Sequence, residues 1–201
     1  MKNIVILVIG LLALTVAPIA QAGNSQQVYE STKPSIEAEF AQLPLSFEKN
    51  NGQTDSRVKY ISRGSDHVLF LAQDEAVLSF QNSDVLRMSL ANSNLNSTIT
   101  ATEELASKSN YFIGNDPNSW HTDITNFAKV KYEGVYPGID LVYYGNQKQL
   151  EYDFIVSPGA NPSDIVIKFT GTEQLHVNDQ GDLIIKTSNG EVIQHAPVTY
   201  Q

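Results

Sequence analysis

Residues 139–156, with the sequence IDLVYYGNQKQLEYDFIV, decide the fold class of this chain. Their second half alternates apolar and other residues, with the apolar positions at Leu150, Tyr152, Phe154 and Val156. Such alternation places one side of a β-strand in a core and the other side toward water. The intervening Gly145–Lys148 predicts a turn, so the stretch is expected to form a β-hairpin. If that loop has four residues and no bulge, Asp140 faces Asp153 across the two strands.

The same period of two recurs along most of the chain. Alternating apolar positions mark strands around residues 86–90, 165–169 and 183–185, and further strands are predicted at 58–61, 68–72, 76–80, 111–113, 129–132, 191–195 and 198–200. Asn189-Gly190 is expected to close a two-residue hairpin turn, and the polar run Asn92–Thr102 is expected to be a long exposed loop or an edge strand. No segment after Phe47 shows a sustained helical period. The sequence therefore predicts an all-β protein, an antiparallel β-sandwich of many short strands with a short N-terminal signal helix.

The first 22 residues have the three parts of a secretory signal peptide. Lys2 supplies a positive charge, Ile4–Ala17 is almost unbroken apolar sequence, and Ala20-Gln21-Ala22 places small residues where a signal peptidase cleaves. An uncleaved anchor is the alternative, but the apolar run is shorter than the ~20 residues of a transmembrane helix. We therefore expect cleavage after Ala22 and a secreted or cell-surface location.

The rest of the chain divides into a polar leader and one domain. Residues 23–44 are predicted to form the leader, with a short helix starting at Ser35. Residues 45–201 are predicted to form the β-sandwich domain. The strand-like pattern continues to residue 201. Two alternatives stay open: the domain is complete, or it lacks a final strand at its C-terminal end.

Composition narrows the range of functions. The 201 residues include 22 Asp and Glu against 13 Lys and Arg, which gives a formal net charge of −9. This charge disfavours nucleic acid and anionic membrane surfaces as partners. The chain has no cysteine, which excludes disulfides, thiolate catalysis and cysteine-ligated metal centres.

Carboxylates are the most abundant groups that could carry chemistry. An Asp140–Asp153 pair would suit a calcium site or the acid pair of a glycosidase, but a solvated outer face is the interpretation that an acidic domain favours. Residues 178–182, with the sequence NDQGD, resemble an oxygen-rich calcium loop but lack its full ligand series, so a β-turn is the simpler interpretation.

Aromatic residues form a second group of candidates. Trp120, the only tryptophan, lies beside His121 in a loop-like context, and one of Tyr143 and Tyr144 must point away from the core. An exposed platform could stack on a sugar or anchor a partner protein, whereas a Trp that closes one end of a core is the structural alternative. Glu48, after the apolar Phe47, is expected to be a partly buried acceptor for loop N–H groups.

No motif specifies an active site. The sequence lacks a nucleophile elbow, a zinc-binding helix signature, a phosphate-binding loop and a dinucleotide fingerprint. The four histidines, at positions 67, 121, 176 and 195, have no spacing that forms a local metal pair. We therefore predict no catalytic, cofactor-binding or metal-binding residues, and no cofactor.

Several blocks resemble one bacterial family. The sequence LSFEKNNGQTD at residues 45–55 is similar to the L-x-F-E-x-N-x-G-Q opening of the N-terminal domain of SBBP (β-propeller) repeat proteins. Residues 109–117 with Trp120, residues 135–154 and residues 158–162 resemble later blocks in the same order. The resemblance covers about residues 45–201. It implies a module of large secreted or surface-attached proteins, placed before propeller repeats, and no catalytic residue is assigned to it. This chain departs from the pattern because it contains no propeller repeats.

The expected function is thus an exported, non-enzymatic β module with a structural or adhesive role. Its expected partners are other domains of a larger surface protein, or an extracellular protein or glycan, with no nucleic acid and no membrane insertion after signal removal. A carbohydrate-active hydrolase and a calcium-dependent adhesin remain as alternatives. The hydrolase requires two carboxyl groups that converge in a cleft, and the adhesin requires several oxygen ligands that meet at one point.

Overall fold

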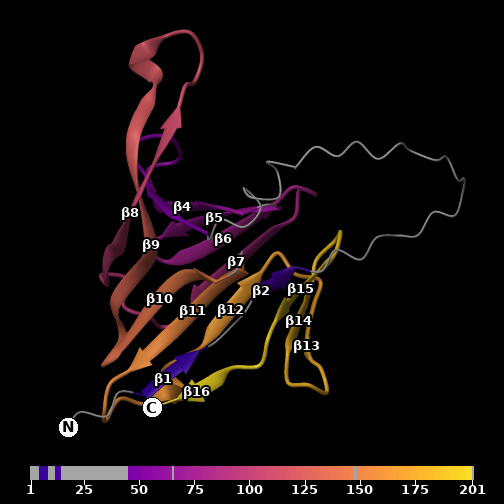
Figure 1. Ribbon diagram of the computed structural model, residues 1–201. Helices are drawn as coiled ribbons and strands as arrows, with labels where there is room; N and C mark the ends of the chain where they lie inside the picture. The colour runs from indigo at the N-terminus through magenta and orange to yellow at the C-terminus, as the bar shows by residue number, and fades with distance from the viewer. Residues whose placement is uncertain (1–4, 9–11, 15–44, 65, 147–148, 201) are drawn as a thin grey trace, which may run out of the picture.

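A computed structural model describes residues 5–8, 12–14, 45–64, 66–146 and 149–200, and nearly all regular structure in them is antiparallel β-strand (Figure 1). The first strands are β1 (Val5–Val8), β2 (Leu12–Leu14), β3 (Phe47–Lys49), β4 (Val58–Arg63), β5 (His67–Ala72), β6 (Glu75–Phe80), β7 (Val85–Leu90) and β8 (Thr98–Tyr111). The later strands are β9 (His121–Tyr136), β10 (Ile139–Asn146), β11 (Gln149–Val156), β12 (Ile167–Thr170), β13 (Gln174–Val177), β14 (Leu183–Lys186), β15 (Glu191–Gln194) and β16 (Val198–Tyr200). Two short 3₁₀ turns are η1 (Pro117–Ser119) and η2 (Pro162–Asp164). The all-β antiparallel prediction is confirmed.

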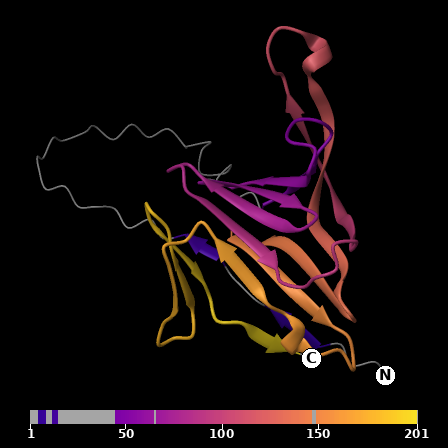
Figure 2. The ribbon, with the colours of Figure 1, turned by 180° about the vertical axis from the view of Figure 1, so that it is seen from behind.

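The described strands form one curled, hydrogen-bonded sheet. The predicted sandwich of two separate sheets is therefore not confirmed. The central order is β12-β7-β6-β5-β4-β3-β9-β10-β11-β2-β15-β14-β13. The sheet is continuous because of β9, a 16-residue strand. It pairs with β3 at Asn126 and Phe127, and then with β10 from Lys129 to Tyr136. One long strand thereby carries the hydrogen bonding from one half of the molecule to the other (Figures 1 and 2).

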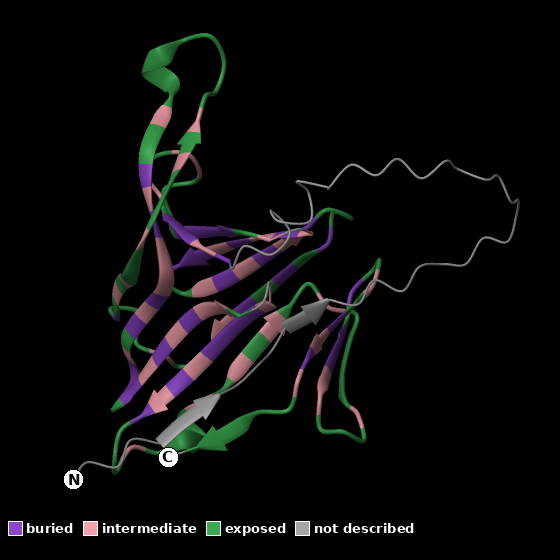
Figure 3. Ribbon diagram, viewed as in Figure 1, coloured by how far each residue is buried: buried purple, intermediate pink, exposed green. Residues whose placement is uncertain are grey.

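The hairpin of residues 139–156 forms as its alternation predicts, but with a different register. Gln149 pairs with Asn146, so only Gln147 and Lys148 lie between the two strands. The expected four-residue loop is therefore wrong, and every pair is shifted by two residues. The buried positions alternate along β10, and along β11 from Tyr152 onward after the buried run Leu150–Tyr152, which gives the banded pattern in Figure 3.

The core lies between the two halves of the curled sheet. Residues of β3 and β5 to β7 meet residues of β9 to β11, and β14 and β15 add Ile185 and Val192. Tyrosine hydroxyls join the halves, because Tyr132 donates to the carbonyl of Ala72 at 2.8 Å and Tyr136 donates to the carbonyl of Ala91 at 2.9 Å. Burial is the stabilising force throughout, since the chain contains no cysteine to form a disulfide.

A buried aspartate connects two distant hairpins. Asp84, before β7, accepts hydrogen bonds from the Thr187 hydroxyl at 2.7 Å, and from the backbone N–H and side chain of Asn189 at 3.0 and 2.8 Å. Burial alone would raise the pKa of Asp84, but these bonds outweigh it and lower the pKa. The β14–β15 turn lies at Ser188-Asn189, because the Thr187 N–H donates to the Gly190 carbonyl. The predicted Asn189-Gly190 turn is thus displaced by one residue.

The N-terminal predictions fall mostly outside the described residues. The leader at 23–44 and its short helix lie outside them entirely. Of the predicted signal helix, the structure describes only β1 and β2, and both are strands. The run at 92–102 divides into a loop and the start of β8 at Thr98, so each of its two expected structures occupies part of it.

Candidate functional site

The most prominent feature of the molecule is a projecting two-stranded arm. β8 and β9 pair from Thr98 with Glu133 to Tyr111 with His121. β9 last pairs with β3 at Asn126; beyond that residue the described strands offer β8 and β9 no partner except each other, and this part projects from the sheet (Figures 1 and 2). We call residues 105–125 the arm and residues 112–120 its tip.

The tip exposes a small apolar cluster. The side chains of Phe112, Ile113 and Trp120 are 65%, 53% and 38% exposed. The rings of Phe112 and Trp120 lie nearly perpendicular, with their centroids 5.2 Å apart, an arrangement that aromatic pairs favour. The Trp120 indole N–H donates to the Gly114 carbonyl at 3.3 Å. These contacts hold large apolar side chains together in water, where no described residue covers them.

Local sequence accounts for the shape of the tip. The Asp116 carboxylate accepts a hydrogen bond from the Asn118 N–H at 3.0 Å and caps η1, in which Pro117 occupies the first turn. Gly114 adopts φ +69°, a left-handed conformation that suits glycine. The tip is therefore an ordered turn, and its apolar side chains are presented in a defined arrangement.

A polar contact ties the arm to β3 from a residue next to the tip. The Tyr111 hydroxyl donates to Oε2 of Glu48, which is 7% exposed on β3. The Arg63 Nε donates to the same hydroxyl at 2.9 Å, and its guanidinium lies 5.3 Å from the centre of the Tyr111 ring. Burial, followed by the bond to Glu48, raises the pKa of Tyr111, so the phenol stays protonated as the donor. Glu48 is buried as expected, but the partner in this bond is a phenol instead of a loop N–H.

The loop after β3 supports the arm from one side. The Asn50 side chain donates to the carbonyls of Asp55 and Val58 at 2.8 and 2.9 Å and accepts from the Gly52 N–H at 3.0 Å. Gly52 has φ +108°, and a Cβ there would lie 3.0 Å from the ring of His121, at the start of β9. The N-x-G-Q block thus has a structural role beside the arm, next to the pair of Tyr111 with His121.

The predicted Asp140–Asp153 pair does not form. In the observed register Asp140 is opposite Ile155, and Asp153 is opposite Val142. Asp140 instead accepts from the Gly134 N–H at 2.7 Å and forms an ion pair with Lys131 at 3.0 Å. These contacts stabilise the β9–β10 connection, where Gly134 has φ +66°.

A groove on the outer face of β9 to β11 contains a different acidic group. It has a volume of about 490 Å³, and its lining includes Lys129, Tyr144, Asp153 and Tyr200. The Tyr144 hydroxyl donates to Asp153 at 3.0 Å. Burial is the main cause of the raised pKa of Asp153. Tyr144 is the tyrosine that points away from the core, as one of the 143–144 pair had to, while Tyr143 is buried.

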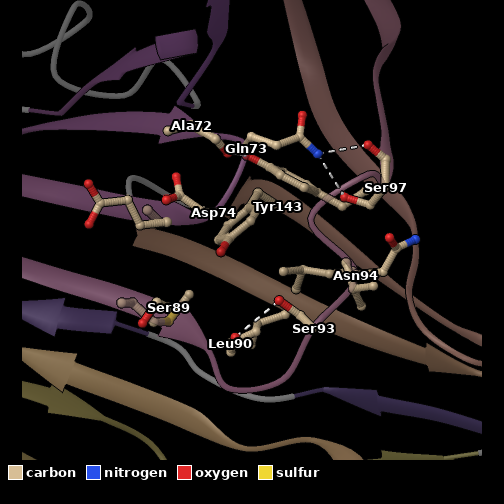
Figure 4. Close-up of a pocket in the computed structure, with 15 residues that line it drawn as sticks. Ala72, Gln73, Asp74, Ser89, Leu90, Ser93, Asn94, Ser97 and Tyr143 are labelled. Carbon is tan, nitrogen blue, oxygen red and sulfur yellow. Dashed lines mark hydrogen bonds between the residues drawn. The ribbon is translucent and has the colours of Figure 1, made fainter. Parts of the chain in front are cut away.

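A small pocket lined by residues of β5 to β7, β9 and β10 has too little room for an organic ligand. Its volume is about 30 Å³, which is room for about one water molecule. Figure 4 shows its polar wall, where the Gln73 amide donates to the carbonyl and hydroxyl of Ser97 at 2.9 and 3.2 Å, and the Ser93 hydroxyl donates to the Leu90 carbonyl. The cavity belongs to the packing of the core.

The 178–182 loop and the histidines were the remaining candidates for a metal site. In the 178–182 loop the Gly181 N–H donates to the backbone carbonyl of Asn178, which makes a β-turn, and the Asn178 side-chain Oδ1 accepts from the N–H groups of Gln180 and Asp182. Asp182 faces His195 at 3.3 Å, and the other histidines are distributed over the described residues. Within those residues, no three His, Asp or Glu side chains lie close enough to hold a metal ion.

The fold and the site together define a curled antiparallel β domain with an aromatic-tipped arm. Residues 47–201 match the family described as Domain of unknown function (DUF7948), and the chain belongs to that family. No curated protein and no solved structure matches the chain. Nothing in these comparisons links the family to SBBP repeat proteins, so that relationship stays a proposal. The part of the chain that the structure describes contains no helix with the length and hydropathy needed to span a membrane.

Proposed function

We propose that the protein is an exported, non-enzymatic β module of a larger cell-surface protein, and that its arm binds an extracellular protein. The observation that carries the proposal is the exposed Phe112, Ile113 and Trp120 cluster on an arm that the Tyr111–Glu48 hydrogen bond ties to β3. Aromatic side chains that project from a rigid support are typical anchors of protein interfaces. The signal-peptide pattern at residues 1–22 and the resemblance to SBBP repeat proteins support export and a surface location.

A protein partner fits the tip better than a glycan. Sugar stacking requires a broad open ring face, whereas Trp120 lies edge to face with Phe112 and is only 38% exposed. Phe112 and Ile113 are the more exposed side chains and carry no polar group that would recognise hydroxyls. Both would fill an apolar pocket of a partner.

The test is binding of the purified mature protein to cells of the source organism from which its gene has been deleted. Replacing Phe112, Ile113 and Trp120 by Ser should weaken binding about tenfold or more, which corresponds to about 1.4 kcal/mol. The matched control is Val177→Ser, because Val177 is 66% exposed on β13. Treating the cells with protease should abolish binding to a protein and spare binding to a glycan. Equal binding by the tip variant and the parent would contradict the proposal.

The groove on the outer face favours a hydrolase as a second candidate. Asp153, with its raised pKa beside Tyr144, resembles a general acid, and Glu151 lies two residues away on the same face of β11. This candidate predicts hydrolysis of aryl glycosides that is lost in Asp153→Asn and in Glu151→Gln. Activity that is absent from the parent, or unchanged in both variants, would remove it.

A further inference from the structure

Two N-terminal strands fill a gap in the sheet. β1 and β2 both run antiparallel to β11, with Val5 opposite Val156 and Leu12 opposite Leu150. On their other side β1 pairs with β16, and β2 pairs with β15. In Figure 1 the two indigo strands lie between the orange and yellow parts of the sheet. β1 and β2 thus each occupy the width of one strand between two strand edges.

Cleavage after Ala22, which is part of the proposed function, would remove both strands. β11 and β15–β16 would then face each other across a gap of about 9.6 Å, twice the spacing of neighbouring strands. Among the described strands β16 pairs only with β1, and β2 is the hydrogen-bonded connection between β11 and β15. Two rows of backbone donors and acceptors would lose their partners at once.

Side-chain contacts would keep the two walls of the gap in place. The Tyr152 hydroxyl on β11 donates to the Gln194 side chain on β15 at 2.9 Å, and this contact is buried. Ile185 and Val192 pack into the common core, and Asn189 is held by Asp84. None of these contacts involves residues 1–22, so the gap would stay open as a strand-shaped slot.

We propose that the mature protein receives an extended apolar β-strand in this slot, supplied by a neighbouring domain of the same surface protein. Direction supports this donor, because the occupant must be antiparallel to both β11 and β16, as β1 is. A strand joined to Tyr200 by a hairpin turn arrives in that direction. The present occupants, VILV and LAL, define the chemistry of the donor as apolar. Strand addition satisfies open backbone groups and gives affinity without a catalytic site.

The experiment compares three exported proteins that begin at Gly23: the chain ending at Gln201, and two fusions that add a turn and a seven-residue strand. One fused strand alternates Val and Thr, and the control has the same composition except for two prolines, which prevent strand pairing. Amide hydrogen exchange in β11 and β16 is the readout. We expect exchange at least about 100-fold slower in the Val–Thr fusion than in the other two proteins.

Unfolding of the unfused chain would not obscure the result. If circular dichroism shows an ordered sheet only in the Val–Thr fusion, the slot requires a donor strand, and the proposal stands. Slow exchange in an unfused monomer would mean that residues 23–44 fill the slot, and slow exchange in a dimer would mean that a second copy fills it. Either outcome, or no protection by the fused strand, overturns the proposal.

The intact mass of the protein recovered after expression of the full-length chain distinguishes failure of this proposal from failure of the proposed function. A mass that retains residues 1–22 would show that β1 and β2 stay in place, which overturns both the slot and the cleavage on which it rests. A mass that begins at Gly23, together with an occupied slot in the unfused monomer, would overturn the slot alone.

Discussion

Replacing Tyr111 by Phe tests whether the arm is clamped to the body of the protein. The substitution removes only the hydroxyl that donates to Glu48, a side chain that is 7% exposed. A hydrogen bond to a charged group contributes about 1.5–3 kcal/mol, and a buried acceptor left without its donor adds a desolvation cost. We therefore expect the free energy of unfolding to fall by about 2 to 4 kcal/mol.

Urea denaturation followed by circular dichroism measures this change. Tyr200→Phe is the matched control, because Tyr200 is 46% exposed and its hydroxyl lies outside the arm; we expect a change within about 0.5 kcal/mol. Glu48→Gln and the double variant complete a double-mutant cycle. The two single effects should sum to more than the double effect, since both remove the same bond.

The emission of Trp120 adds a local measurement, because this residue is the only tryptophan in the chain and lies at the tip. Loosening of the arm in Tyr111→Phe should increase quenching of Trp120 by acrylamide under native conditions. A loss of stability no larger than that of Tyr200→Phe, with additive effects in the cycle, would refute the clamp.

Three further predictions concern the body of the protein. Asp84→Ala should lower the free energy of unfolding by about 3 kcal/mol, because it removes the acceptor of hydrogen bonds from the Thr187 hydroxyl and from the backbone N–H and side chain of Asn189. Because the folded-state pKa of Asp84 is lowered, ionised Asp84 stabilises the folded protein fully above the ordinary carboxyl pKa, and this stabilisation is lost as pH falls through the lowered value. Urea unfolding midpoints at several acidic pH values should therefore depend less on pH in Asp84→Ala than in the parent. Gly171→Ala should cost at least about 2 kcal/mol by the same assay, because Gly171 has φ +86° and an added Cβ would lie 2.0 Å from the Val85 carbonyl oxygen. Because the folded-state pKa of Asp153 is raised, the parent loses stability as pH rises from the ordinary carboxyl pKa to the raised value. The free energy of unfolding of Asp153→Asn relative to that of the parent should therefore increase across this pH range. A difference that does not change with pH would contradict the raised pKa.

Local alternation was sufficient to predict most of the strands. Leu150, Tyr152, Phe154 and Val156 are buried, as the pattern requires. The strand register could not be predicted, because a two-residue and a four-residue turn fit the same sequence. The two-residue turn shifts the pairing by two positions, so Asp140 is opposite Ile155 and not Asp153. The local pattern specifies the buried face of a strand but not its partner along the edge.

The sheet connection and the arm depend on contacts between distant segments. β9 has no sequence signal that distinguishes a 16-residue strand shared by two halves from two short strands in separate sheets. Trp120 was recognised as a candidate, yet its exposure depends on the absence of covering structure, which no local motif encodes. Phe112 was predicted within a strand at 111–113, but β8 ends at Tyr111, and Phe112 lies in solvent at the tip.

The contact between Asp84 and Asn189 has a consequence for the order in which the chain acquires its structure. The two residues are 105 positions apart in the sequence, so a nascent polypeptide exposes the Asp84 carboxylate until a further 105 residues have followed it. Contacts of such separation slow folding, because a long loop must close before they form. The β6–β7 corner is therefore expected to be the last part of the newly made domain to become protease-resistant, and any chaperone that protects the nascent domain has its longest opportunity there.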